Sequence, residues 1–352
     1  MKPERHTHIL ILLAAVAAVQ LLTLATSKDF YLTQLTMTAY YSLIIIGLCL
    51  LMGYAGQISL GHAGFFAIGG YTSAVLTTAD LSRHKDTVFV GLLAKISVLT
   101  ERQDLYGGHH LSVQPWVAFI IAIALTVIIA FAIGVPVLKL KGHYLAMATL
   151  GFGTIIYSFV LGTESFGAAD GVSSVPAFPL LPGLTVSGAA DLRVQNYYIA
   201  WGLVMAGMVL LVNLINSRVG RALRSIHGAE DAASAMGVDT ARYKLNTFVL
   251  SAVFAAVAGV FLTHFNGGIG PSEASIMKSV RYVAIVAVGG MASLWGTLIM
   301  SAVLNFLSLR GYFGSLDDAV FGGILILIML FSPDGILQFD VKAMIKKLFR
   351  ST

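Results

Sequence analysis

Long apolar runs separated by short polar segments dominate this chain. Most runs are about 17 to 25 residues long, which suits helices that cross a hydrocarbon core of roughly 30 Å. Because the runs are continuously apolar, they do not have the alternation expected of membrane β-strands. The pattern predicts an all-α, polytopic membrane bundle with about 8–10 transmembrane or half-membrane helices. The runs lie at residues 9–25, 35–52, 58–79, 115–138, 143–162, 197–215, 246–265, 281–309 and 318–332.

Two of these runs contain glycine-rich interruptions, so we predict broken helices near residues 53–64 and 289–296. The first interruption lies within "GYAGQISLGHAGFFAIGGY", residues 53–71, and the second is "GGMASLWG", which repeats a Gly, Ser-Leu, Gly pattern. Glycine permits an unwound turn and close helix packing. We expect a half-helix to start near Ser59, with its free N–H groups and dipole directed at a substrate carboxylate.

Broken helices at matching positions are common in transporters and point to the substrate path. Five side chains at the interruptions are therefore candidates to line such a path. The alternative is that the polar ones only hydrogen-bond to neighbouring helices and that the tryptophan only packs. The candidates are Gln57, Ser59, His62, Ser293 and Trp295.

Basic segments predict the orientation, because positively charged loops favour the cytoplasmic side. With a cytoplasmic N-terminus, both "KLKGH" at 139–143 and the polar loop at 216–245 fall on the cytoplasmic side. The basic tail at 340–352 joins them only if the run at 281–309 enters and returns on one side. Both termini are then cytoplasmic, and the insertion at 80–114 is outside. The alternative for the first run is a cleaved secretory signal.

Composition supports a single transmembrane domain over residues 1–352. The chain is 57% hydrophobic and 11% charged, with a mean hydropathy of +0.85, whereas soluble domains have roughly 25% charged residues. The net charge of +5 arises from basic residues beside the spans, so nucleic-acid binding is not expected. Cys49 is the single cysteine, which excludes an intramolecular disulfide. The histidines of the insertion lack a third ligand at useful spacing, so no metal site is expected.

Sequence motifs of enzymes are absent. The chain has no Gly-x-Ser-x-Gly, no His-Glu-x-x-His and no Gly-Lys dipeptide, so it has no P-loop and is not expected to be an enzyme. The centres of the apolar runs carry no acidic residue or arginine, which argues against an ion-driven carrier but leaves a passive channel open.

The loop at 216–245 contains a predicted short helix with acidic residues in its first turn and a glycine stop. A compact face at positions 229, 232, 233 and 236 suits a groove on another protein. The alternative is a helix that lies on the protein's own inner surface. The residues of this segment are Glu230, Asp231, Ala232, Ala233, Met236 and Gly237.

The same loop carries a family resemblance. "RVGRALRSIHGAEDAASAMGVDTARYKLNTFVLSAVFAAVAGVF" resembles the branched-chain amino acid permeases of ATP-binding-cassette importers, the LivM type more than the LivH type. Four further blocks match in order: "GYAGQISLGHAGFFAIGGYTSAVL", "KGHYLAMATLGFG", "VAVGGMASLWG" and "FSPDGIL". The resemblance covers most of residues 35–338.

The resemblance implies a permease in the bacterial inner membrane that works with a LivH-type permease, two ABC ATPase subunits and an extracytoplasmic substrate-binding protein. ATP and Mg would be bound by the ATPases and no cofactor by this chain, and residues 230–237 would couple to the ATPases. Three outer segments depart from the family pattern: residues 80–114, "TESFGAADGVSSVP" and "IGPSEAS". The substrate therefore stays open between branched-chain amino acids and urea or short amides, and a stand-alone channel is the alternative from another class.

Overall fold

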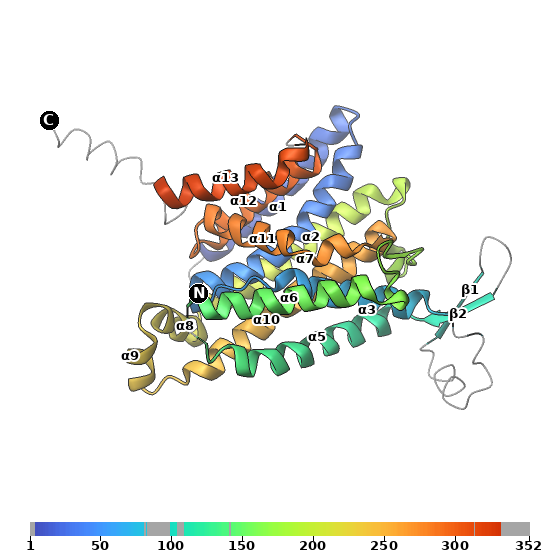
Figure 1. The fold of residues 1–352 in the computed structure, drawn as a ribbon. Helices are drawn as coiled ribbons and strands as arrows, with labels where there is room; N and C mark the ends of the chain where they lie inside the picture. Colours follow the sequence, from blue (N-terminus) through green and yellow to red (C-terminus); the bar gives the residue numbers. More distant parts are fainter. Residues whose placement is uncertain are drawn as a thin grey trace.

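The computed structural model describes residues 4–80, 82, 99–103, 109–140, 142–312 and 314–331. Most of the predicted outer insertion, with His84, and the basic tail at 340–352 lie outside the described residues. Within them the chain forms a helical bundle, as the apolar runs predict (Figure 1).

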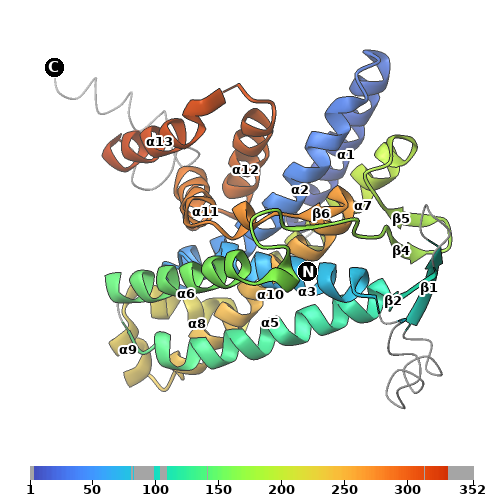
Figure 2. The same cartoon turned by 45° about the vertical axis from the view of Figure 1, so that its right-hand side comes forward.

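Successive helices run back and forth through the bundle (Figures 1 and 2). The helices of the bundle are α1 (Glu4–Ala25), α2 (Phe30–Cys49), α3 (His62–Thr78), α5 (Pro115–Val137), α6 (His143–Gly162), α7 (Arg193–Ile215), α10 (Thr240–Asn266), α11 (Ile276–Gly289), α12 (Leu294–Leu309) and α13 (Asp317–Phe331). Six of the described helical segments are long and apolar enough to span a membrane. The shorter ones are α3, α11, α12 and α13, with 14 to 17 residues each.

The predicted run at 281–309 is two helices, α11 and α12, which pack against each other and are joined by a tight turn. Fourteen residues of α11 are about 21 Å long, so this helix is shorter than an ordinary span. Because the run reverses direction, it returns to the end of the bundle where it began, as the sequence predicts.

Helices α2 and α10 form the centre of the bundle. The window around α2 is 89% buried and that of α10 is 72% buried, whereas α1 is only 17% buried. A helix that is apolar on all sides can be enclosed by others, and α2 packs against α7, α10, α11 and α12. Glycines allow α3 and α10 to approach closely, because a Cβ on Gly69 would lie 2.5 Å from the Ala256 carbonyl oxygen.

The two ends of the bundle differ. At one end, which we call the α8 end, lie α8 (Arg218–Gly228) and α9 (Glu230–Ala235). At the opposite end, which we call the strand end, the described residues form three two-stranded sheets that the sequence did not predict (Figure 2). They pair β1 (Leu99–Gln103) with β2 (His109–Val113), β3 (Val172–Ser173) with β6 (Gly268–Ile269), and β4 (Phe178–Leu181) with β5 (Leu184–Val186).

Short helical turns complete the structure. A π-helical turn, η1 (Leu50–Tyr54), ends α2, and the 3-10 turns are η3 (Glu164–Phe166), η4 (Ala190–Leu192), η5 (Pro271–Ala274) and η6 (Gly314–Leu316).

Candidate functional site

The two predicted helix breaks meet in space. After the π-helical turn η1, residues 55–61 are not helical except at position 55, and α3 begins at His62, three residues after the predicted start. The second break lies between Gly289 and Leu294. The breaks near 53–64 and 289–296 are therefore confirmed.

Contacts between the breaks are direct. The Tyr54 hydroxyl donates a hydrogen bond of 2.7 Å to the Ala292 carbonyl oxygen, and the Cys49 thiol donates one of 3.4 Å to the Met291 carbonyl oxygen. A Cβ on Gly53 would lie only 1.4 Å from that same Met291 oxygen. Only glycine therefore permits the observed approach of the two backbones.

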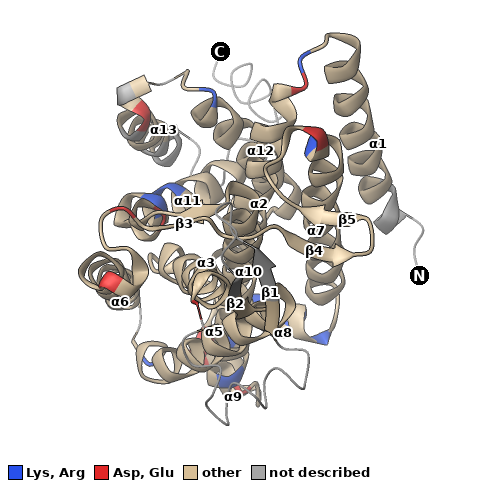
Figure 3. Ribbon diagram, turned by 90° about the vertical axis from the view of Figure 1, so that its right-hand side faces the viewer, with Lys and Arg blue, Asp and Glu red and all other residues tan. Residues whose placement is uncertain are grey.

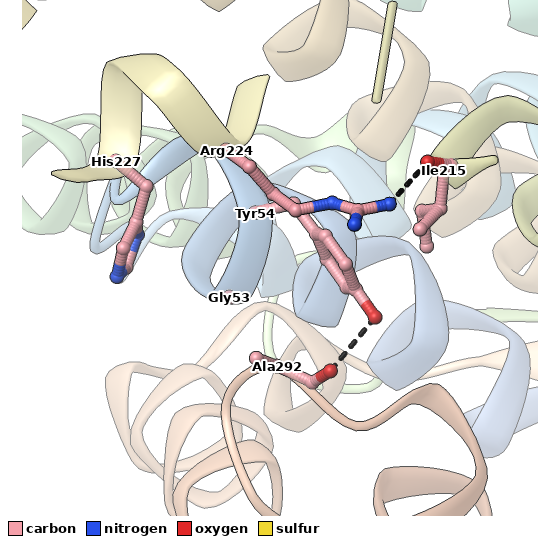
Figure 4. A pocket seen from close by; sticks show the side chains of 6 residues that line it. All are labelled: Gly53, Tyr54, Ile215, Arg224, His227 and Ala292. Atoms are coloured by element: carbon pink, nitrogen blue, oxygen red, sulfur yellow. Dashed lines mark hydrogen bonds between the residues drawn. The ribbon is translucent and has the colours of Figure 1, made fainter. Parts of the chain in front are cut away.

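Helix α8 lies against this junction and closes one side of a cavity of about 330 Å³ (Figure 4). Arg224 of α8 donates a 2.6 Å hydrogen bond to the carbonyl oxygen of Ile215, at the end of α7. His227 contacts the first break, since a Cβ on Gly56 would lie 2.9 Å from its Nδ1. The cavity is lined by Gly53, Tyr54, Ile215, Arg224, His227 and Ala292.

Helix α9 follows α8 and is held by an ion pair. The Glu230 carboxylate lies 2.8 Å from the Lys244 ammonium group of α10, whose side chain is only 8% exposed. Gly237 ends the segment with a φ of 82°, in the left-handed region that suits a glycine stop. The predicted acidic first turn and glycine stop are both present.

The predicted docking face of α9 is divided. Ala233 is buried against the chain itself, whereas Ala232 is exposed and Met236 is 85% exposed. Because Ala233 faces inward, it cannot contact a partner without rearrangement. The surface that α9 leaves open consists of Ala232, Met236 and their exposed neighbours.

The polar residues of the first break have different surroundings. His62 is fully buried, and its ring nitrogens lie 3.0 Å from the Ser59 hydroxyl and 2.7 Å from the Ser251 hydroxyl of α10. His62 thus connects α3 to α10 and also bonds to Ser59 of the break, so both residues hydrogen-bond within the protein, as the alternative interpretation of the sequence allowed. Gln57 is 2% exposed, and neither atom of its side-chain amide has a partner among the described residues.

The residues of the second break have local roles in this conformation. The Ser293 hydroxyl caps α12 by accepting a hydrogen bond of 3.1 Å from the Gly296 amide. Trp295 is partly buried and lies 5.7 Å, between ring centroids, from His8 of α1. The packing interpretation of Trp295 matches this arrangement.

The chain matches the family described as "Branched-chain amino acid transport system / permease component" over residues 30–329. It belongs to this family. The permease is 30% identical over 346 residues to the high-affinity branched-chain amino acid transport system permease protein LivM of Escherichia coli K12, covering 91% of this chain and 74% of that protein. No solved structure matches the chain.

More distant relatives include the second permease type. The LivH protein of Salmonella typhimurium is 28% identical over 306 residues, covering 86% of this permease and 92% of LivH. The BraD protein of Pseudomonas aeruginosa is 26% identical over 330 residues, covering 87% of this permease and 95% of BraD. These relatives support a multi-pass permease subunit of an amino-acid importer and a pair of permeases in the system.

Sequence reasoning missed a group of charged residues on and beside α11. Glu273, Lys278 and Arg281 lie within and directly before this helix (Figure 3). From the sequence, the segment around Glu273 stood out only as an outer departure from the family pattern. The signal was present, because three ionisable residues within nine positions at the start of an apolar run are unusual in a membrane helix.

Proposed function

We propose that this permease is one of two membrane subunits of an ABC importer in the bacterial inner membrane. It translocates branched-chain or related amino acids, which an extracytoplasmic binding protein delivers to the strand end. The α8 end and both termini are cytoplasmic. The names of the relatives support the cargo, and the occurrence of both LivM and LivH relatives supports a permease pair.

The observation that carries the proposal is the contact of α8 with the first helix break, which itself touches the second break. Of two ATPase subunits, which bind ATP and Mg, one docks on the open surface of α9 around Ala232 and Met236. Its movement is transmitted through Arg224 and His227, which reach the end of α7 and the first break. Both breaks interrupt the helical hydrogen-bond pattern, so they are suited to act as hinges.

Gln57 is the residue of the first break that we expect to face the path. A buried amide without partners costs about 1–3 kcal/mol, and this cost is removed if the amide binds a passing solute or water. Ser59 and His62 support the wall behind it through their bonds to each other and to α10.

Transport measurements test the proposal. We expect ATP-dependent uptake of labelled leucine in cells with this gene and its loss in cells without it, while uptake of urea and glutamate is unchanged. Uptake that persists after ATP depletion would refute the importer and indicate a channel. ATP-dependent uptake of urea alone would preserve the ABC mechanism but overturn the proposed cargo.

A matched pair of substitutions tests the coupling surface. Ala232 of α9 and Ala241 in the first turn of α10 are both exposed, so the same Ala→Asp change introduces the same charge at each site. We expect Ala232→Asp to abolish uptake with a normal amount of permease in the membrane, and Ala241→Asp to retain it. Equal uptake by the two variants would contradict ATPase docking on α9.

A further inference from the structure

A half-buried charged cluster joins α2 to η5 and the start of α11, below the strand end. One carboxylate oxygen of Glu273 lies 3.1 Å from the Lys278 ammonium nitrogen and accepts a 3.0 Å hydrogen bond from the Tyr41 hydroxyl. Lys278 also donates a 3.1 Å hydrogen bond to the Tyr41 oxygen. Tyr41 lies about three turns inside α2, so the cluster is within the bundle rather than on its surface loops.

Several polar atoms around this carboxylate have no partner. Among the described residues, none bonds to the second oxygen of Glu273 or to the hydroxyls of Tyr71 and Tyr282. Both tyrosines are 1% exposed. The ring of Tyr282 lies 6.3 Å, between centroids, from that of Tyr41, and Tyr71 lies on α3, which packs against the η5 turn that carries Glu273. Buried polar groups are nearly always satisfied, so an unpaired carboxylate oxygen together with two unpaired tyrosine hydroxyls indicates a missing ligand.

The two charged side chains are partly exposed, although the second Glu273 oxygen itself is buried. The side chains of Lys278 and Glu273 are 23% and 18% exposed, and charged groups at membrane depth face a water-filled path or another protein rather than lipid. Arg281, about one turn further along α11, is engaged with Asp317 and with the ring of Phe321. Lys278 is different, because within the part of the chain that the structure describes its bonds to Tyr41 and Glu273 use two of its three N–H donors.

We propose that this cluster is an outer binding site for the zwitterionic head group of an amino acid. The second Glu273 oxygen accepts from the α-ammonium group, and the third Lys278 donor binds the α-carboxylate. The hydroxyls of Tyr71 and Tyr282 complete these bonds, and the rings of Tyr41 and Tyr282, with centroids 6.3 Å apart, accompany an apolar side chain. A neutral amide cannot use both charges, so the site selects amino acids.

This inference rests on the proposed function, but direct binding tests it separately from uptake. The importer is purified through a tag on this chain, without its binding protein, and titrated with leucine, leucinamide or 4-methylpentanoate. Leucinamide lacks the carboxylate and 4-methylpentanoate lacks the ammonium group. We expect leucine to bind at least about tenfold more tightly than either, the effect of one lost charge-assisted hydrogen bond.

Substitutions connect this preference to the cluster. Glu273→Gln should weaken leucine binding by about tenfold and remove the preference over 4-methylpentanoate, whereas Glu164→Gln, at an exposed glutamate of the strand end, should change neither. Tyr282→Phe removes a hydroxyl that has no partner among the described residues, so it should weaken leucine binding without lowering the Tm.

Unchanged leucine affinity in both Glu273→Gln and Tyr282→Phe, with a lower Tm in the first, would show that the cluster only holds α11 to α2. Absence of leucine binding by the unmodified complex would also overturn the site. ATP-dependent leucine uptake together with either of these results would leave the proposed function standing. ATP-independent uptake with the expected binding would overturn that function but not the site.

Discussion

The contact between the two helix breaks makes Gly53 the most informative position for substitution. An alanine Cβ at this position would lie 1.4 Å from the Met291 carbonyl oxygen, whereas real Cβ contacts essentially never fall under 3.0 Å. The neighbour is backbone, which cannot rotate away as a side chain does. Gly53→Ala must therefore separate the two breaks by at least about 1.6 Å, the difference between these distances.

The cost of this separation has two sources. Overpacking in a close-packed interior costs about 1–3 kcal/mol. The shift also weakens the bonds from Tyr54 to Ala292 and from Cys49 to Met291, each with a net value of about 1 kcal/mol. We expect a total loss of about 2–4 kcal/mol in the free energy of unfolding and a decrease in apparent Tm of roughly 5 °C or more.

The assay is thermal unfolding of the detergent-solubilised permease, followed by size-exclusion chromatography, together with leucine uptake in cells. Gly151→Ala is the matched control, because Gly151 is helical and a Cβ there meets nothing within 4 Å. Alanine in a helix interior is favoured by up to about 1 kcal/mol over glycine, so this control should be neutral or stabilising. Equal Tm and uptake for the two variants would refute the argument that the breaks require direct backbone contact.

Two further substitutions test neighbouring parts of the site. His62→Phe keeps an aromatic ring but leaves the buried hydroxyls of Ser59 and Ser251 without their bonds to the imidazole. It should therefore destabilise the fold by about 1–3 kcal/mol. An unchanged Tm would show that these bonds add no net stability. Ala233→Asp places a charge at a position that is 5% exposed, so it should reduce both Tm and uptake. Ala232→Asp, at an exposed position, should reduce uptake alone. A normal Tm with lost uptake in Ala233→Asp would mean that Ala233 turns outward to meet a partner.

The helices and their two breaks could be predicted from local sequence, because apolar runs and glycine clusters are strong signals that need no distant contact. An apolar run of sufficient length must be helical in a membrane, where every backbone polar group needs an internal partner. The runs at 143–162 and 115–138 therefore correspond to α6 and α5 almost residue by residue. Glycine clusters likewise marked both helix breaks, because glycine permits the turns and close approaches that other residues prevent.

The partners of each polar side chain depended on the tertiary structure. Ser59 and Gln57 are two positions apart, yet one is hydrogen-bonded to His62 and the other has an unsatisfied amide among the described residues. Similarly, nothing in the local pattern distinguished Ala232, which is exposed, from Ala233, which is buried. Such differences depend on which distant helix lies opposite.

The sequence by itself determined that this is a helical membrane permease with two interrupted helices and a family-typical polar loop between α7 and α10. Only the tertiary structure decided that the interruptions touch each other, that α8 contacts the first of them, and that Glu273 and Lys278 meet Tyr41 within the bundle. The physical reason is sequence separation: Tyr41 and Glu273 are 232 residues apart. Their contact arises from the packing of α11 against α2, which no local periodicity encodes.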